Sequence, residues 1–485
     1  MNRELKRVST LVIAFFITLF VSASVIQVGQ DANLASDERN TRTIYDSYRS
    51  QRGAILVAGQ PIALSVPVDD NYRFQRTYPA PLIYANVTGY FTLSQGITGI
   101  EGAMNRELSG TSGSQFLNRL NSILTGQDPQ GASVNLTLDP LLQQAAWDAL
   151  GDYAGSVVVT EPKTGRILAM VSKPSFDPNV LASHDTASVI SAYDALIADP
   201  GNPLIDRSIT GNLNPPGSVF KLVVAAAALE SGQYTADSQL NNPASLRLPG
   251  SDSVVSNWNR GRCPGAGATV TLKQALRESC NIPFAELGLA LGRQALLTQA
   301  KKFGFNSSFE IPMTTAASTF PTVMDDPQTM LASFGQFDVR ATPLQIAMVS
   351  AAIANGGKVM SPTLLQSVLD PTLTSLFGFQ ATQYSQAISA QTAASLTEMM
   401  VDGVNNGLAR NARISGVQVA GKTGTAENGV GEPYTFWFTG FAPADNPRYA
   451  ITVLVENGGG LGQEGLSGPI AGSIAKYVLE AELGK

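Results

Sequence analysis

The hydrophobic pattern begins with a run of residues, 11–28, that carries no charge. A helix of this length spans about 27 Å, close to the hydrocarbon thickness of a bilayer. Basic residues precede the run and acidic residues follow it, which predicts a cytoplasmic amino terminus and an outer location for the rest. These flanking residues are Arg3, Lys6 and Arg7 before the run, and Asp31, Asp37 and Glu38 after it. A signal peptide cleaved near Ser22-Ala23-Ser24 is the alternative, but we favour an uncleaved anchor.

The stretch that follows, up to about residue 138, is polar and rich in turn residues. Short alternating patterns predict strands at 54–57 and 62–66. A patch of serine and glycine at 109–114 predicts an exposed loop. No group of chemically reactive side chains stands out here, so we interpret the stretch as a pedestal that lifts the next unit off the membrane.

A second unit begins near 134–138, and its pattern is that of a mixed α+β domain. Alternating residues predict two strands early in the unit and three late in it, at 156–160, 166–171, 417–425, 434–441 and 449–455. Helical patterns lie mostly between them, at 141–150, 222–229, 284–291, 346–354, 393–400 and 470–483. This order predicts one sheet of about five mostly antiparallel strands with helices packed on it.

Composition excludes several classes of protein. The 485 residues are 44% hydrophobic and carry a net charge of −6, so a basic surface for nucleic acid is not expected. His184 is the single histidine, which argues against Ser-His-Asp catalysis and histidine metal sites; we expect it in a loop. Cys263 and Cys280 are too few for a zinc cluster. They either close a loop of about 17 residues as a disulfide, which export would favour, or stay free thiols.

Ser218 is the candidate nucleophile. Pro215-Pro216-Gly217 forms a turn before it, and the apolar run 222–229 after it predicts a buried helix. The serine therefore lies at the positive end of a helix dipole, with Lys221 on the same face. To act as a base Lys221 must be neutral, which requires burial or a nearby cation. The same spacing recurs at Ser473 and Lys476, so it is a weak signal by itself.

Two further groups strengthen this interpretation. Ser279-Cys280-Asn281 opens the helical run 284–291, and Lys422-Thr423-Gly424-Thr425 lies on a predicted strand where glycine permits close backbone approach. Similar tripeptides occur at 133–135 and 163–165, but the first lies in a strand-like run and the second in a hairpin turn. Both also precede the serine.

In this order, Ser-x-x-Lys, Ser-x-Asn and Lys-Thr-Gly resemble the signature of penicillin-recognising serine enzymes. The chain looks like a class B penicillin-binding protein, a peptidoglycan DD-transpeptidase, and most resembles the actinobacterial penicillin-binding protein A group. Other runs that carry the resemblance are Arg52-Gly53-Ala54-Ile55, Gly99-Ile100-Glu101, Leu108-Ser109-Gly110, Pro174-Ser175-Phe176-Asp177-Pro178-Asn179 and Thr342-Pro343-Leu344-Gln345. The resemblance implies a transpeptidase fold of the serine β-lactamase kind, with a helical subdomain and a dimerisation-like pedestal.

The resemblance also implies roles for the site residues. Ser218 would attack the D-alanyl-D-alanine carbonyl of a peptidoglycan stem while Lys221 takes its proton. The backbone N–H groups of Ser218 and Thr425 would bind the oxyanion. Ser279 would relay a proton to the leaving amine, and Asn281 would hold the substrate amide. Lys422, Thr423, Gly424 and Thr425 would form the carboxylate site, and β-lactams would acylate the serine. No metal or organic cofactor is required.

The sequence leaves some alternatives open. A carboxypeptidase or a β-lactamase would use the same motifs, and a non-catalytic division scaffold would keep the fold. We divide the chain into a tail (1–10), an anchor (11–28), a pedestal (29–138) and a transpeptidase domain (139–485), with cell-wall synthesis or division proteins as expected partners.

Overall fold

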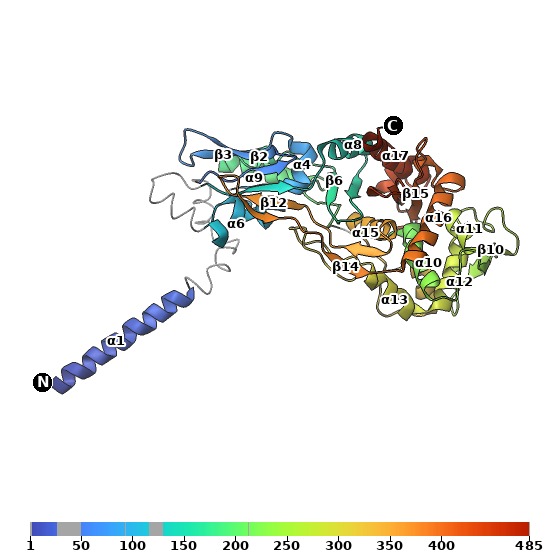
Figure 1. Ribbon diagram of the computed structural model, residues 1–485, viewed down its shortest axis with the longest axis horizontal. Coiled ribbons are helices and arrows are strands. Elements are labelled where there is room, and N and C mark those ends of the chain that lie inside the picture. Colours follow the sequence, from blue (N-terminus) through green and yellow to red (C-terminus); the bar gives the residue numbers. More distant parts are fainter. Residues whose placement is uncertain (1, 27–49, 93, 116–129, 212, 485) are drawn as a thin grey trace.

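The computed structural model describes residues 2–26, 50–92, 94–115, 130–211 and 213–484. Figure 1 shows the N-terminal helix α1 (Asn2–Ser24), a β-rich unit next to it, and a larger unit with a sheet and many helices. Within α1 the apolar window Leu5–Ser24 is long enough to cross a membrane, and none of it is buried. The helix therefore starts before the predicted run. Residues 27–28, Asp31, Asp37 and Glu38 lie outside the described part.

The β-rich unit is built on a six-stranded sheet with the order β13-β12-β4-β1-β2-β3. Its strands are β1 (Ile55–Val57), β2 (Gln60–Pro67), β3 (Phe74–Thr77), β4 (Ser133–Leu136), β12 (Leu365–Leu369) and β13 (Ser375–Gly378). Strands β1 and β4 run parallel and the other pairs are antiparallel. Short helices cover it, namely α4 (Pro81–Thr88), α5 (Gly99–Ala103) and α6 (Asn105–Leu108). The two predicted strands of this region are confirmed.

Two of these strands come from far along the chain. The sequence division placed 365–378 in the second unit, whereas the structure pairs β12 with β4, and β13 with β12. Their sequence has no marker for this, because strand periodicity shows which face is buried but not which strand is the partner. The connection ties the two units together at a sheet rather than through a linker.

The predicted exposed loop at 109–114 is only partly exposed. Ser109, Gly110 and Ser112 are buried. The backbone of Gly110 lies so close to Gln130 that an added Cβ would come within 3.0 Å of its carbonyl oxygen, at a φ of +75°. The prediction was wrong at these positions because small side chains also mark close backbone packing, not only solvent-exposed turns.

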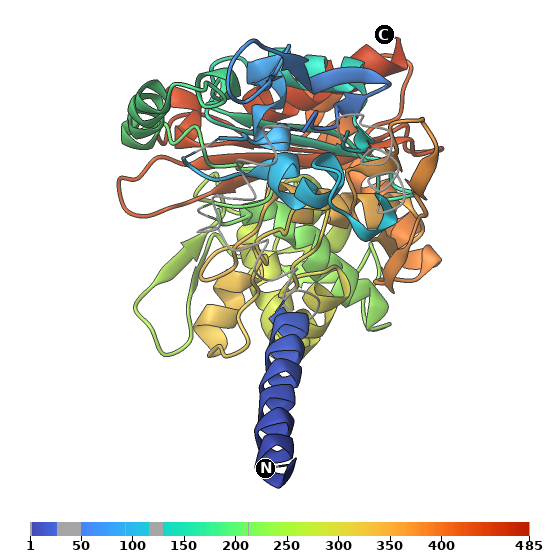
Figure 2. The same cartoon turned by 90° about the vertical axis from the view of Figure 1, so that its left-hand side faces the viewer.

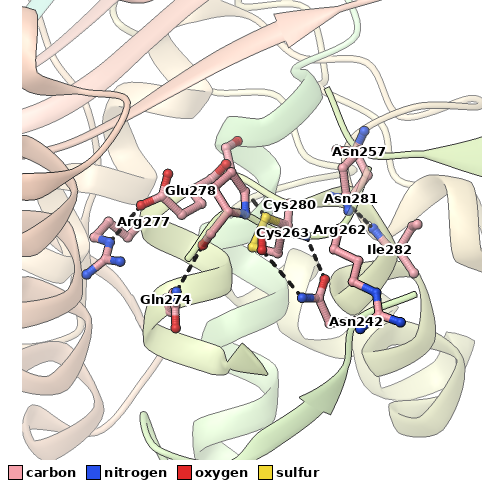
Figure 3. The surroundings of a disulfide bond; sticks show 12 residues. Asn242, Asn257, Arg262, Cys263, Gln274, Arg277, Glu278, Cys280, Asn281 and Ile282 are labelled. Carbon is pink, nitrogen blue, oxygen red and sulfur yellow. Dashed lines mark hydrogen bonds and ion pairs between the residues drawn. A yellow bond between two sulfur atoms is a disulfide. The ribbon is translucent and has the colours of Figure 1, made fainter. Parts of the chain in front are cut away.

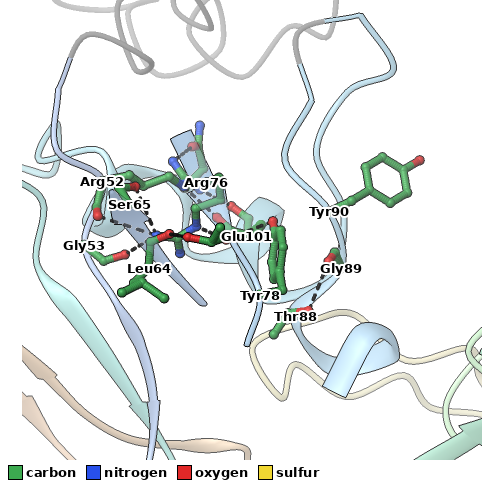
Figure 4. Close-up of polar contacts among 12 residues, drawn as sticks. Arg52, Gly53, Leu64, Ser65, Arg76, Tyr78, Thr88, Gly89, Tyr90 and Glu101 are labelled. Atoms are coloured by element: carbon green, nitrogen blue, oxygen red, sulfur yellow. Dashed lines mark hydrogen bonds and ion pairs between the residues drawn. The ribbon is translucent and has the colours of Figure 1, made fainter. Parts of the chain in front are cut away.

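A buried charge cluster holds the first unit together (Figure 4). Glu101 accepts hydrogen bonds from Nε of Arg52 and Nε of Arg76, both at 2.6 Å, and all three side chains are at most 1% exposed. The two arginines lower the pKa of Glu101 below its usual value, although burial alone would raise it. The cluster joins three distant stretches of the sequence, so its partners could not be inferred from spacing.

The larger unit contains a five-stranded sheet with the order β15-β16-β17-β5-β6, and all pairs are antiparallel. Its strands are β5 (Gly155–Thr160), β6 (Ile167–Lys173), β15 (Ala420–Ala426), β16 (Thr435–Ala442) and β17 (Tyr449–Val455). The predicted sheet is confirmed in strand number, strand position and direction. The hairpin of β5 and β6 pairs with β17, the last strand in the chain, so β15 lies at the opposite edge of the sheet.

Helices cover both faces of this sheet, so its strands are buried on both sides. In β5, Val157 and Val159 pack with α8 (Pro140–Leu150) and α17 (Ser473–Leu483). Val158 between them packs with the core that contains α10 (Lys221–Glu230), α15 (Pro343–Ala354) and α16 (Ala390–Asn406). This alternation follows from the two-residue period of a strand.

A helical region extends from the face that carries α10, and in Figure 2 its green and yellow segments gather below the sheet. Its helices are α11 (Leu272–Arg277), α12 (Asn281–Leu291), α13 (Arg293–Lys302) and α14 (Asp326–Ala332). Two small two-stranded sheets lie in the same region. One pairs β7 (Gln239–Asn241) with β10 (Thr269–Thr271), and the other pairs β8 (Ser245–Arg247) with β9 (Val254–Ser256). Further elements are α9 (Thr186–Ala198) and the pair β11 (Lys358–Met360) and β14 (Gln383–Gln386).

Candidate active site

Ser218 lies on a 3₁₀ turn (Gly217–Phe220) that leads directly into α10. Gly217 has a φ of +53°, and an added Cβ would lie 2.6 Å from the carbonyl oxygen of Thr425. The indole of Trp437 donates to the carbonyl of Pro215 at 2.9 Å, and Gly217 N–H donates to the carbonyl of Gly335 at 3.0 Å. The turn is thus fixed against β15 and β16, with the serine at its exposed side.

Lys221 is fully buried behind the serine. Its Nζ lies 3.0 Å from Ser218 Oγ, and it donates to the backbone carbonyl of Ser279 and to Oδ1 of Asn281, each at 2.8 Å. Burial lowers the pKa of Lys221 well below its usual value, and the nearby charge of Lys422 lowers it further. This shift favours the neutral amine, which can accept a proton from the serine hydroxyl.

Ser279 and Asn281 lie at the junction between α11 and α12. Ser279 has a φ of +55°, an unfavourable backbone conformation for a side chain other than glycine. In this conformation the carbonyl of Ser279 accepts a hydrogen bond from Lys221, and its hydroxyl accepts one from Lys422. The side-chain oxygen of Asn281 accepts a hydrogen bond from Lys221, and its side-chain nitrogen donates one to the carbonyl of Ser256 at 3.0 Å. One amide hydrogen of Asn281 therefore has a partner and the second can serve a ligand.

Lys422 and its neighbours lie on β15, at the edge of the sheet. The Nζ of Lys422 donates to Oγ of Ser279 at 2.7 Å and to the carbonyl of Thr423 at 2.8 Å. Burial lowers the pKa of Lys422 to about 7. At Gly424 an added Cβ would lie 3.0 Å from the carbonyl oxygen of Pro216, so glycine lets the strand approach the serine turn.

The structure therefore brings Ser218, Lys221, Ser279, Asn281 and Lys422 into one connected network. Thr425 lies three residues after Lys422 on β15, and its hydroxyl donates to Oγ of Ser467 at 3.2 Å. Ser467 directly precedes a short π-helical turn (Gly468–Gly472), a type of distortion that often accompanies functional sites. No sequence signal pointed to Ser467, because a lone serine in a glycine-rich stretch has no distinctive pattern.

The weaker sequence matches lie elsewhere. Ser473 and Lys476 lie on α17, where Lys476 forms an ion pair with Glu480 at 3.7 Å. The matches at 133–135 and 163–165 lie in β4 and in the turn between β5 and β6. His184 pairs with Asp70 at 2.5 Å. Within the described ranges, no group of three or more His, Cys, Asp or Glu side chains is placed to hold a metal ion.

Cys263 and Cys280 form a disulfide beside this site (Figure 3). Asn242 accepts from the backbone N–H of Cys263 at 2.7 Å, and Asn257 accepts from the backbone N–H of Asn281 at 2.8 Å. The disulfide and the two asparagines together fix the start of α12. Neither asparagine was identified from the sequence, because each acts through the backbone of a residue about 20 positions away.

Replacing both cysteines with serine is expected to lower the free energy of unfolding by about 3 kcal/mol, because the closed loop of 17 residues restricts the unfolded chain. Urea unfolding of the oxidised protein and of the double variant would measure the difference. Free alkylation of both thiols in the unreduced protein would contradict the bond itself.

Comparisons with known proteins agree with this arrangement. Residues 155–480 match the penicillin-binding protein transpeptidase domain, and residues 52–134 match the penicillin-binding protein A dimerisation domain. This chain belongs to the penicillin-binding protein family. The resemblance inferred from the three motifs is thereby confirmed.

Other penicillin-binding proteins match over most of their length. The peptidoglycan D,D-transpeptidase PbpA of Mycolicibacterium smegmatis is 41% identical, over 100% of this chain and 99% of the relative. The structure of penicillin-binding protein A from M. tuberculosis as a ceftriaxone acyl-enzyme complex has a TM-score of 0.87 and 41% identity, covering 90% of this chain and 100% of that one. Pseudomonas aeruginosa PBP2 matches with a TM-score of 0.73 and 29% identity, over 90% and 96%.

Proposed function

We propose that this penicillin-binding protein is a membrane-anchored peptidoglycan D,D-transpeptidase that works through an acyl-enzyme on Ser218. The observation that carries the proposal is the 3.0 Å contact between Ser218 Oγ and Nζ of the fully buried Lys221. A serine becomes a strong nucleophile when an adjacent neutral base accepts its proton. The names and acyl-enzyme structures of the relatives support the same chemistry.

Acylation begins with proton transfer from Ser218 to neutral Lys221. A neutral amine has two hydrogens, and these match the carbonyl of Ser279 and Oδ1 of Asn281, which leaves its lone pair for the serine hydroxyl. The oxygen of Ser218 then forms a bond to the carbonyl between two terminal D-alanines. Backbone N–H groups of Ser218 and Thr425 stabilise the oxyanion.

The leaving D-alanine takes its proton from the hydroxyl of Ser279. Lys422, bonded to that hydroxyl at 2.7 Å, can return a proton to it, because its pKa of about 7 permits both protonation states. Lys422, Thr423 and Thr425 bind the terminal carboxylate of the substrate. The second amide hydrogen of Asn281 binds the substrate amide.

An amine from a neighbouring stem then attacks the carbonyl of the acyl-enzyme and loses a proton to the Ser279–Lys422 pair, which gave one up during acylation. The ester bond to Ser218 breaks as protonated Lys221 returns its proton to the serine oxygen, and the new amide is the cross-link. β-Lactams acylate Ser218 in the same way, because they mimic the D-alanyl-D-alanine end. The chain's own residues supply the base, the oxyanion donors and the carboxylate site, so the mechanism uses no cofactor.

Product analysis distinguishes this function from its rivals. The protein is incubated with a D-Ala-D-Ala peptide and an amine acceptor, and the products are separated by mass. We expect amide exchange to exceed hydrolysis. Free D-alanine with hydrolysis alone would indicate a carboxypeptidase, and fast destruction of penicillin a β-lactamase. If no D-alanine is released, a scaffold role gains support.

The pH dependence of acylation follows from the two lysines. Acylation requires neutral Lys221, so its rate is expected to fall as the pH drops through the pKa of that residue. Replacing Lys422 with glutamine removes a neighbouring positive charge, which raises the pKa of Lys221 and moves the acidic limb to higher pH. Acylation rates measured between about pH 5 and 9 test this. An acidic limb that stays in place or moves to lower pH would contradict it.

We assign α1 as an uncleaved membrane anchor, with the rest of the chain on the extracytoplasmic side. The unburied apolar window and the basic residues Arg3, Lys6 and Arg7 support this orientation, as does a disulfide typical of oxidising compartments. We keep the division into tail, anchor, pedestal and transpeptidase domain, with β12 and β13 added to the pedestal sheet. Cell-wall synthesis or division proteins are the expected partners.

A further inference from the structure

A cavity of about 680 Å³ lies beside the proposed acylation site. Three of its lining residues have close links to that site. Pro215 lies three positions before Ser218, and Glu427 two positions after Thr425. Gln336 follows Gly335, whose carbonyl accepts from the N–H of Gly217. The cavity therefore adjoins the place where the acyl group forms, and none of the roles assigned above uses it.

The proposed function sets the direction in which a donor peptide enters this region, and the inference rests on it. The terminal carboxylate lies at Lys422 and Thr423, and the reacting carbonyl lies at the N–H of Thr425. The donor follows the free edge of β15, so its preceding residues continue past Thr425 toward Glu427. The residue before D-alanyl-D-alanine then reaches the cavity with its side chain.

The proposed function constrains the chemistry of that residue. One stem serves as the donor and another as the acceptor of the same polymer, so the donor carries the same cross-linking amine. The cavity offers one carboxylate, Glu427, and one guanidinium, Arg340, among the uncharged side chains of Asn428, Tyr434 and Gln463. One charge of each sign matches a side chain that ends like an amino acid, with an ammonium and a carboxylate.

We propose that this cavity is a donor subsite that binds the amino-acid end of the stem side chain, with the ammonium at Glu427 and the carboxylate at Arg340. The guanidinium is held by its NH1, which donates to the carbonyls of Phe337 and Val339 at 2.7 and 3.0 Å. Its remaining N–H groups form a planar edge suited to a carboxylate.

The walls of the subsite are fixed before any ligand binds. In the amide orientation that satisfies both backbone groups of Glu427, Gln336 accepts from the N–H at 3.1 Å and donates to the carbonyl at 3.2 Å. Asn428 donates to the carbonyl of Pro433 at 2.7 Å, and Gln463 donates to the carbonyl of Glu432 at 2.9 Å. A site held in this way loses little entropy when it orders a ligand.

Two penicillins that differ only in their acyl side chain test the proposal. One carries an aminoadipoyl group, which ends in an ammonium and a carboxylate, and the other an uncharged hexanoyl group. The second-order rate of acylation of the full chain is measured by intact mass. We expect the aminoadipoyl compound to react about tenfold faster, the effect of one well-placed ion pair.

The variants E427Q and R340Q are each expected to bring this rate ratio close to one. E464Q, which removes an exposed carboxylate outside the cavity, is the matched control and should keep the wild-type ratio. General damage to the protein would slow both compounds and leave the ratio unchanged. A wild-type ratio of one or less, or variants that keep the ratio, would overturn the subsite. Failure of both penicillins to acylate Ser218 would instead overturn the proposed function.

Discussion

The variant K221M is expected to acylate about 10²- to 10⁴-fold more slowly than the wild type, which is the range that a positioned general base contributes. Methionine keeps most of the volume of lysine, but its thioether sulfur is too weak a base to accept the proton of Ser218. The substitution also removes the hydrogen bonds that the buried amine donates to Ser279 and Asn281, which could lower stability. The acylation rate is therefore measured by quenched-flow mixing and intact mass, and thermal unfolding is measured alongside it.

The second Ser-x-x-Lys sequence provides a matched control for this prediction. K476M removes a lysine at the same spacing from a serine, on α17, where Lys476 forms an ion pair with Glu480 at 3.7 Å. It should acylate at the wild-type rate. If K221M retained acylation within tenfold of the wild type, or if the two variants behaved alike, Lys221 would not be the base.

The variant E101Q is expected to lose about 3–5 kcal/mol of unfolding free energy, because it leaves two buried arginines without a counter-charge. Glutamine has nearly the same shape as glutamate, so the loss reports the charge rather than a cavity. Urea unfolding followed by circular dichroism measures it. Because folding lowers the pKa of Glu101, its stabilisation is present above the unfolded pKa, about 4.3, and is lost as the pH falls through the folded value.

Glu398 is a suitable control for this substitution, since it is exposed on α16. The variant E398Q should change stability by less than about 0.5 kcal/mol, as surface substitutions usually do. A loss below about 1 kcal/mol in E101Q would mean that the cluster does not hold the pedestal together.

Local patterns predicted the central sheet well. Each strand from β15 to β17 alternates between two covered faces, and glycine or proline marks its ends, so position and direction follow from the chain alone. The pedestal sheet was harder, because β12 and β13 come from more than 200 residues after β4. Pairing over such a separation depends on tertiary packing, which a single sequence does not encode in any local period.

The same distinction between local patterns and distant contacts applies to the candidate site. Ser218, Ser279 and Lys422 each belong to a short motif whose order along the chain could be recognised. The residues that hold these motifs in place, such as Trp437, Asn257 and Ser467, act through contacts with backbone or hydroxyl groups. Such contacts leave no spacing rule in the sequence, so only the structure reveals them.

The central claim is that Ser218 forms a covalent acyl-enzyme. The most direct test is the intact mass of the protein after incubation with penicillin, measured beside the S218A variant. We predict a mass increase equal to one penicillin that persists for many minutes in the wild type and is absent in S218A. An adduct that forms equally in S218A, or no adduct on either protein, would contradict the account.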